Sequence, residues 1–335
     1  MSTADRRAPR GRRAAGFTVL EMVVTTAILG LTTLVIERTI TSAMDAERSM
    51  RAVRNTADRC QAATYHLRDE VTSARRLFQA DAVGTAYLAK LGLPASMPKL
   101  TGSRLPVFDE TKSLGPDTAG SPKTGNILFF VRDADPLPCI ANPATKKIRL
   151  IDSYRFVCFY LTVSTKTLVA GGPPALELVE WKSERFPSYA QVMAITTGSE
   201  KVNVVKDLYA RHNIDYLWDL TKPVTTAFFA IDGSGNVNAS PTNPSQIPED
   251  LNVSTRGRFV AANLGIARTD MASKMRQPVF TVDDPLTWTP HGFEVKVASP
   301  SGARRVWLRL TVEQQASKGR VPAHQTTIVA TTRDT

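Results

Sequence analysis

Cysteine and histidine are scarce in this sequence, and the common catalytic motifs are missing from it. The 335 residues include three cysteines and four histidines. Three cysteines are too few for a disulfide-rich scaffold. No paired-cysteine zinc motif, HExxH helix, phosphate-binding loop or serine nucleophile elbow occurs in the sequence. We therefore expect a protein that is not an enzyme, that needs no cofactor, and whose histidines are structural or exposed.

Proline is absent between Phe17 and Pro94, so no proline breaks a helix there. Apolar residues recur every three or four positions from Ile36 to Phe78, which is the pattern of one helical face. We expect one helix from Phe17 to about Gln79, which at 1.5 Å per residue would be roughly 95 Å long. Its first part, residues 17–36, is apolar all round, and residues 37–80 continue it as an amphipathic helix that packs on a sheet.

The apolar first part of this helix contains a single ionisable residue, Glu21. A run of about 20 such residues is long enough to cross a bilayer. An acid at the centre of a membrane helix costs roughly 2.5–3.5 kcal/mol on insertion scales, so such residues usually have a partner and a function. Five arginines precede the run, which predicts that the N-terminal flank is cytoplasmic and that the rest of the chain is periplasmic.

The first forty residues resemble the N-terminal cleavage and methylation segment of type IV prepilins and type II secretion pseudopilins. The matching features are a basic leader over residues 1–16 that ends in Gly16, then Phe17, and an acid at Glu21. The resemblance implies that a prepilin peptidase cuts after Gly16 and methylates the new amine of Phe17. It also implies that Glu21 neutralises the N-terminal ammonium of a neighbouring subunit, since a buried charge is tolerated beside an opposite one.

Three other interpretations of this segment are weaker. A plain signal anchor also has a basic flank and an apolar helix, but it has no reason to keep Glu21. A cleaved secretory signal has an apolar core of about 7–15 residues, which is shorter than the run here. A chance match in the core helix of a soluble protein does not explain the arginines of the leader.

The pattern changes after the helix. Residues 81–125 are expected to be an irregular loop, because glycine, proline and serine are dense from residue 92 onward. From residue 126, β-branched and aromatic runs predict strands. The expected strands are residues 127–131, 148–164, 167–170, 175–181, 189–196, 224–231, 259–263, 293–297, 305–312 and 326–331. The predicted fold class is α+β, a long helix followed by a mostly antiparallel β-sheet head over residues 126–335.

Cys139 and Cys158 are candidates for a disulfide, because they lie in the part expected in the periplasm, where disulfides persist. Closing their loop of about 20 residues would add on the order of 3 kcal/mol. The alternative is two buried free thiols. Cys60 lies on the amphipathic stripe and is expected to be a small buried hydrophobe.

Asp232, Ser234 and Asn236 occupy positions 1, 3 and 5 of the segment DGSGN, a spacing that can hold calcium through oxygen ligands. Position 12 of such a loop should be an acid, but here it is Asn243. A glycine-rich turn is therefore the favoured interpretation, with calcium as the alternative.

The net charge is +11, and loss of the leader removes five positive charges and one negative charge to leave +7. The arginines of the helix alternate with acids, which favours a solvated face over DNA binding. The segments YRFVCFYLTVS with LELVEW, and ARRVWLRLTVEQ with TTIVATTRD, are similar to strands of large PilW-type minor pilins.

The resemblance implies a structural minor pilin that is processed in the inner membrane and joins a type IV pilus, at its tip as part of a priming complex. The implied partners are the prepilin peptidase, other minor and major pilins or pseudopilins, the inner-membrane assembly platform and the lipid bilayer. Two alternatives stay open: a J-class pseudopilin of type II secretion, and a signal-anchored periplasmic binding or adhesion domain.

Overall fold

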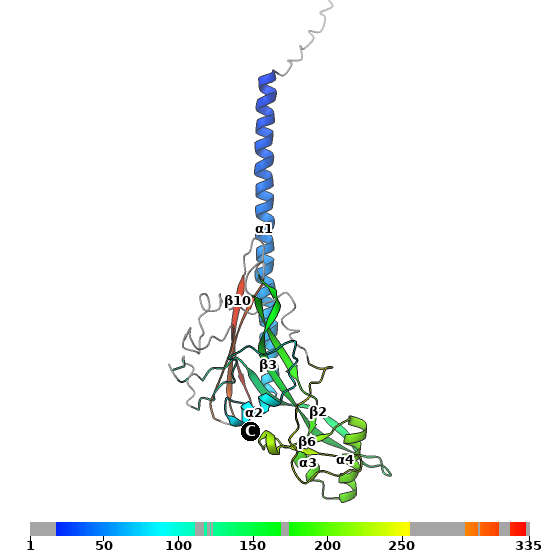
Figure 1. The fold of residues 1–335 in the computed structure, drawn as a ribbon. Helices are drawn as coiled ribbons and strands as arrows, with labels where there is room; N and C mark the ends of the chain where they lie inside the picture. The colour runs from blue at the N-terminus through cyan, green and yellow to red at the C-terminus, as the bar shows by residue number, and fades with distance from the viewer. Residues whose placement is uncertain are drawn as a thin grey trace, which may run out of the picture. The chain divides into compact units, whose positions relative to one another are not determined.

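The computed structural model describes residues 18–110, 117–118, 121, 123–168, 174–254, 292–300, 302–314 and 322–332. The chain divides into two compact units, Met1–Met50 and Arg51–Thr335. A long helix, α1 (Val19–Thr72), begins in the first unit and ends in the second. Antiparallel sheets follow it along the chain, so the predicted α+β class is confirmed (Figure 1).

The elements after α1 are all in the second unit. They are β1 (Ala74–Leu77), α2 (Ala82–Lys90), β2 (Leu128–Asn142), β3 (Lys147–Thr167), β4 (Pro174–Lys182), β5 (Phe186–Pro187), α3 (Tyr189–Met193), α4 (Gly198–His212), β6 (Tyr216–Trp218), the 3₁₀ helix η1 (Val224–Thr226), β7 (Phe228–Ala230), β8 (Phe293–Ala298), β9 (Arg305–Glu313) and β10 (Ala323–Thr331).

The strands form three sheets within the described residues. The largest has the order β1-β2-β3-β4, with β5 also paired to β3. A second sheet has the order β10-β9-β8, and β6 and β7 make a two-stranded pair. Every pairing between these strands is antiparallel. Most neighbouring strands are consecutive along the chain, as in hairpins, whereas α2 and a long connection separate β1 from β2.

Both faces of the largest sheet are covered, which explains why its strands read as continuous apolar runs. Alternate side chains of β2 and β3 belong to two different clusters. Phe130 and Phe159 face the cluster that contains α1 and the β8–β10 sheet. Phe129 and Phe156 face the cluster that contains α2, β6 and β7.

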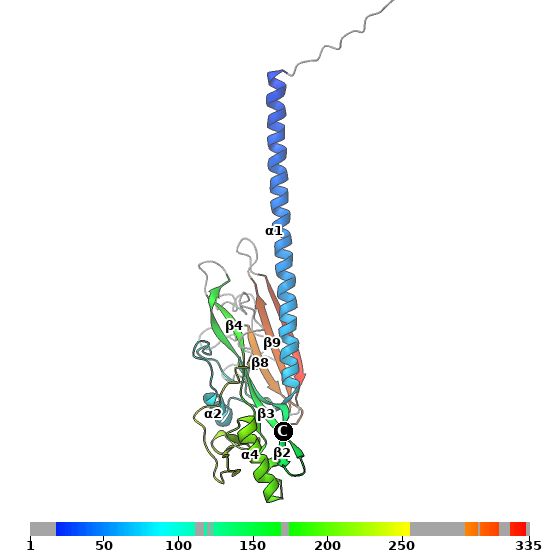
Figure 2. The same ribbon diagram turned by 90° about the vertical axis from the view of Figure 1, so that its right-hand side faces the viewer.

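Within the second unit, the last five turns of α1 pack against the sheets. The buried residues of the helix are Ala52, Thr56, Cys60, Ala63, Thr64, Leu67, Glu70 and Val71. Cys60, Leu67 and Val71 share a cluster with residues of β2, β3, β8 and β9, and Figure 2 shows this part of α1 alongside β8 and β9. The expected stripe is therefore buried only from Ala52 onward, and Ile40 and Val53, which the periodicity assigned to it, are exposed.

Four element predictions were wrong. The helix ends at Thr72 instead of near residue 80, because the chain pairs with β2 from Ala74 onward. The interval 81–125 contains a helix, α2, whose N-cap Asp81 accepts a hydrogen bond from the N–H of Gly84 (2.6 Å). The expected strand 189–196 begins with helix α3, capped by Ser188.

The fourth error concerns residues 224–231, which split into η1 and the short strand β7. The expected strand 259–263 and the second half of the expected strand 167–170 lie outside the described residues.

Candidate functional site

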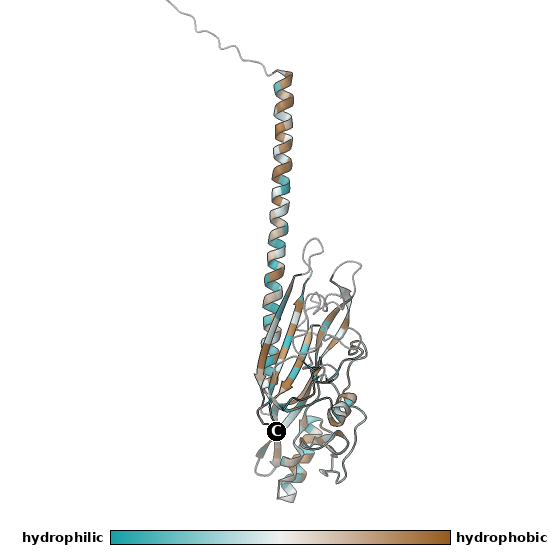
Figure 3. Ribbon diagram, turned by 90° about the vertical axis from the view of Figure 1, so that its left-hand side faces the viewer, coloured by the Kyte–Doolittle hydropathy of each residue, from teal (hydrophilic) through white to brown (hydrophobic). Residues whose placement is uncertain are grey.

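The first part of α1 is an apolar surface that no described part of the chain covers. No described residue from 18 to 50 is buried. Val19, Leu20 and Leu29 each expose more than two thirds of their surface. In the view of Figure 3, hydrophobic residues predominate along this part, whereas hydrophilic residues are frequent further along the helix. Among the described helices, α1 is the one with a window long and apolar enough to cross a membrane.

Glu21 closes the start of this helix through a capping box. The backbone N–H of Thr18 donates to Glu21 Oε2 (2.9 Å), and the Thr18 hydroxyl donates to the same oxygen (3.0 Å). In return, the backbone N–H of Glu21 donates to Thr18 Oγ1 (3.3 Å). This is the reciprocal arrangement of the sequence pattern Thr-x-x-Glu, which satisfies backbone donors that a helix start leaves unpaired. The Thr18–Glu21 spacing would have predicted it.

The threonines of the first part of α1 do not present free hydroxyl donors. Four threonine hydroxyls in this part each donate to the backbone carbonyl four residues earlier, at distances of 2.6–2.8 Å. The residues concerned are Thr25, Thr26, Thr32 and Thr33. A donor satisfied within its own helix does not need water, so these threonines are compatible with an apolar environment.

Gly16 and Phe17, the predicted cleavage and methylation residues, lie outside the described residues. Of the three residues that carry the prepilin resemblance, only Glu21 is described. The cleavage and the pairing with a neighbouring ammonium therefore stay predictions.

The predicted disulfide between Cys139 and Cys158 is wrong, because all three cysteines are free and buried. Cys158 lies opposite Phe129 in the β2–β3 ladder, whereas Cys139 lies opposite Arg149. Ten residues of β2 separate these positions, which is roughly 33 Å of strand. The two cysteines are close in sequence, but they lie at different heights along the long β2–β3 hairpin, which the sequence spacing does not show.

Asp232 closes a turn in the segment DGSGN. One of its carboxylate oxygens accepts from the backbone N–H groups of Ser234 and Asn236 (2.9 Å each), and the other accepts from Asn236 Nδ2 (3.0 Å). These local hydrogen bonds lower the pKa of the Asp232 carboxyl. This geometry is that of the favoured turn, in which the Asp232 carboxylate accepts hydrogen bonds from its own loop.

A buried group of ionic side chains joins α1 to the largest sheet, and it was missed from the sequence. Glu70 Oε1 lies 2.7 Å from Arg132 Nη1 and 3.0 Å from Lys182 Nζ. Lys182 Nζ also lies 3.0 Å from Glu180 Oε1, which is 2.9 Å from His66 Nε2. His66, Glu70 and Glu180 are close enough to hold a metal ion. The two cations already neutralise the two acids, so we interpret the group as a structural ion-pair network.

No protein-family model, no curated protein and no solved structure matches the chain.

Proposed function

We propose that this chain is a filament subunit of the type IV pilin class, a PilW-like minor pilin that is cut after Gly16. The observation that carries the proposal is the helix part with apolar residues on every side and a single acid, Glu21, near its start. Such a surface needs a bilayer before assembly and the helices of other subunits after it. The antiparallel head is compatible with this class, and a J-class pseudopilin is the alternative within it.

Glu21 distinguishes a filament subunit from a plain membrane anchor. In a processed chain the free amine of Phe17 would be one residue from Thr18, whose N–H the carboxylate already accepts. In a water-free filament core the positive amine requires an opposite charge. Breaking a buried ion pair by removing one partner costs about 3–5 kcal/mol. An anchor that never leaves the bilayer makes no such demand on Glu21.

The first experiment is mass spectrometry of the N-terminal peptide of the cellular protein, with and without its prepilin peptidase. We expect a chain that begins with N-methylated Phe17, and the loss of this species without the peptidase. A chain that still carries the leader in cells with an active peptidase would contradict the proposal and favour a signal anchor.

A second experiment separates the charge of Glu21 from its capping role. Glu21→Gln keeps a side-chain acceptor at the third helix position, where Glu and Gln both complete a capping box, but it removes the charge. We expect Glu21→Gln and Glu21→Ala both to abolish incorporation into sheared filaments while the chain stays in the membrane. Glu37→Gln, on the same helix beyond the apolar part, is the control that should assemble normally. Normal assembly of Glu21→Gln would restrict Glu21 to capping.

A further inference from the structure

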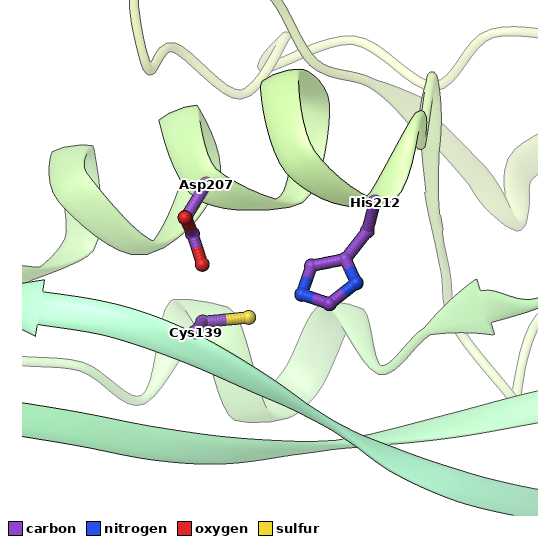
Figure 4. Close-up of side chains that lie close together, drawn as sticks. All are labelled: Cys139, Asp207 and His212. Carbon is purple, nitrogen blue, oxygen red and sulfur yellow. The ribbon is translucent and has the colours of Figure 1, made fainter.

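A thiol, a carboxylate and an imidazole converge between β2 and α4 in the second unit. Cys139 lies on β2, and Asp207 and His212 lie on the last two turns of α4. One ligand atom from each residue lies within 4.8 Å of the other two. Figure 4 shows the three side chains pointing toward a common space between the strand and the helix. The network around Glu70 does not use any of them.

The packing of α4 on β2 holds these residues in place. Asp207 Oδ2 accepts a hydrogen bond from the N–H of Ile140 (3.0 Å), and Asn203 Nδ2 donates to the carbonyl of Ala141 (3.1 Å). Cys139 belongs to an apolar cluster with Val204 and Leu208. A carboxylate oriented by a backbone N–H, with its other oxygen directed elsewhere, is a common arrangement around protein-bound metals.

The three donor types suit a borderline cation such as Zn²⁺, which is bound by cysteine, histidine and carboxylate ligands. Two dipoles at this position also favour a cation. α4 ends at His212, and the C-terminal end of a helix attracts cations. The carbonyl of Pro138 lies 3.1 Å from His212 Nε2 and contributes a further negative dipole.

A nucleophilic role for Cys139 is less suitable. Its side chain is fully buried, and structural buried cysteines are inert as nucleophiles. A metal ion instead displaces the thiol proton when it binds.

Arg211 is the one charged competitor among the described neighbours. Its guanidinium lies 3.3 Å from Asp207 Oδ2 and 3.1 Å from His212 Nε2, and it also contacts the carbonyl of Pro138. The Arg211 side chain is 45% exposed, so it can rotate into solvent when a cation enters. The acids around Glu70, by contrast, have Arg132 and Lys182 against them, and both cations are more buried than Arg211.

We propose that Cys139, Asp207 and His212 form a three-ligand site for a zinc-class divalent cation, with water in the fourth position. All three residues belong to the second unit, so the proposed site does not rest on the proposed filament function. A bound ion would join the end of α4 to β2 through a bond stronger than the present packing.

The test is a titration with Co²⁺. The sample is the full-length chain in detergent, reduced and freed of metal with a chelator. A bond between Co²⁺ and a thiolate gives a charge-transfer absorption in the near ultraviolet. We expect this absorption to saturate at one Co²⁺ per chain and to disappear when Zn²⁺ is added. Cys139→Ser should abolish it, and His212→Gln should weaken Co²⁺ binding about 10-fold or more. Arg211→Ala should tighten binding, because it removes the competing charge.

Cys60→Ser is the matched control. Cys60 is also a buried free thiol, but its Sγ contacts Leu310 O and Thr326 Oγ1 instead of other metal-binding groups. It should keep the full cobalt signal. If Cys139→Ser does not fold, judged by fluorescence of the buried Trp181 and Trp218, then His212→Gln is the deciding variant, because His212 is only partly buried whereas Cys139 is fully buried. The site would be overturned if the unmodified chain gave no charge-transfer absorption. It would also be overturned if Cys139→Ser kept this absorption, or if His212→Gln bound Co²⁺ as tightly as the unmodified chain.

Discussion

Glu70 and Glu180 are acids inside the protein, only 5% and 1% exposed. A buried carboxylate is tolerated when a cation is beside it, and here Arg132 and Lys182 supply that charge. Because Glu70 belongs to α1, and Arg132 and Lys182 belong to β2 and β4, the network specifies how the helix lies on the sheet.

Removing Glu70 should therefore be costly. Glu70→Ala leaves Lys182 with one acid and Arg132 with none among the interactions described, and loss of one partner from a buried pair costs about 3–5 kcal/mol. Arg75→Ala is the comparison, because the Arg75–Asp133 pair is half exposed and should contribute at most about 1 kcal/mol. The measurement is urea unfolding followed by tryptophan fluorescence. Equal losses in the two variants would show that the network is no stronger than a surface pair.

The three thiols give a second prediction. Because all are free and buried, alkylation without a reducing agent should modify none of them in the native chain and three in denaturant, as read by intact mass. A single modified thiol in denaturant would restore the Cys139–Cys158 disulfide.

The pH dependence of stability follows from the same burial. The pKa of Cys139 rises from its ordinary value of 9 to about 12 on folding, so the thiol is neutral in both states below pH 9. Between pH 9 and about 12 the unfolded chain ionises first. The free energy of unfolding should therefore fall as the pH rises through this range. Cys139→Ala should have a shallower fall there in urea unfolding at several pH values, whereas an unchanged slope would assign the loss to other groups.

At the scale of an element, the packed part of α1 buries one face and leaves the other exposed. Val71 is fully buried against the sheets, whereas Val53, on the same helix, is 54% exposed. Val71→Ala should cost about 2–3 kcal/mol, from the lost apolar burial and the cavity that remains. Val53→Ala should change stability little, because alanine is at least as good a helix former. Urea unfolding of both variants measures this, and a large loss in Val53→Ala would show that the face of the helix that carries Val53 is packed after all.

The elements show which sequence signals were sufficient. The long helix and the buried strands β3, β4, β8 and β9 were predicted because their apolar patterns persist over many residues. The end of α1 was missed because Val71, Ala74 and Phe78 keep helical spacing although the last two lie beyond the helix, one in β1 and one after it. Helices α2 and α3 were missed because their caps, Asp81 and Ser188, were not used as start signals.

The candidate sites were predictable to different degrees. The apolar run and Glu21 are contiguous in sequence, so their association needs no tertiary structure. Cys139, Asp207 and His212 are brought together only by the packing of α4 on β2, and no local spacing encodes that contact. The predicted pairing of Cys139 with Cys158 was wrong because two residues that are close in sequence can lie far apart along a long hairpin.

At the scale of the whole molecule, the division after Met50 predicts a separable head. A chain that starts at Arg51 keeps every buried residue of α1, since these begin at Ala52. It should be soluble without detergent and should unfold with a free energy within about 1 kcal/mol of the full chain, a shift of roughly 2–4 °C in Tm for a domain of this size. Calorimetry of both chains in the same buffer is the measurement. Aggregation of the shorter chain would show that residues before Arg51 protect the head.

The threonine hydroxyls of α1 donate to carbonyls of their own helix. Among the described residues of its first part, directional bonding to anything outside the helix is therefore confined to the Thr18–Glu21 end. Lipid tails and the apolar side chains of other helices are about equally apolar surroundings for the remaining surface of α1. Its transfer from one to the other therefore changes the hydrophobic free energy little. Under the proposed function, the apolar surface would favour neither environment strongly, and the pairing of the Glu21 carboxylate would decide the direction of transfer.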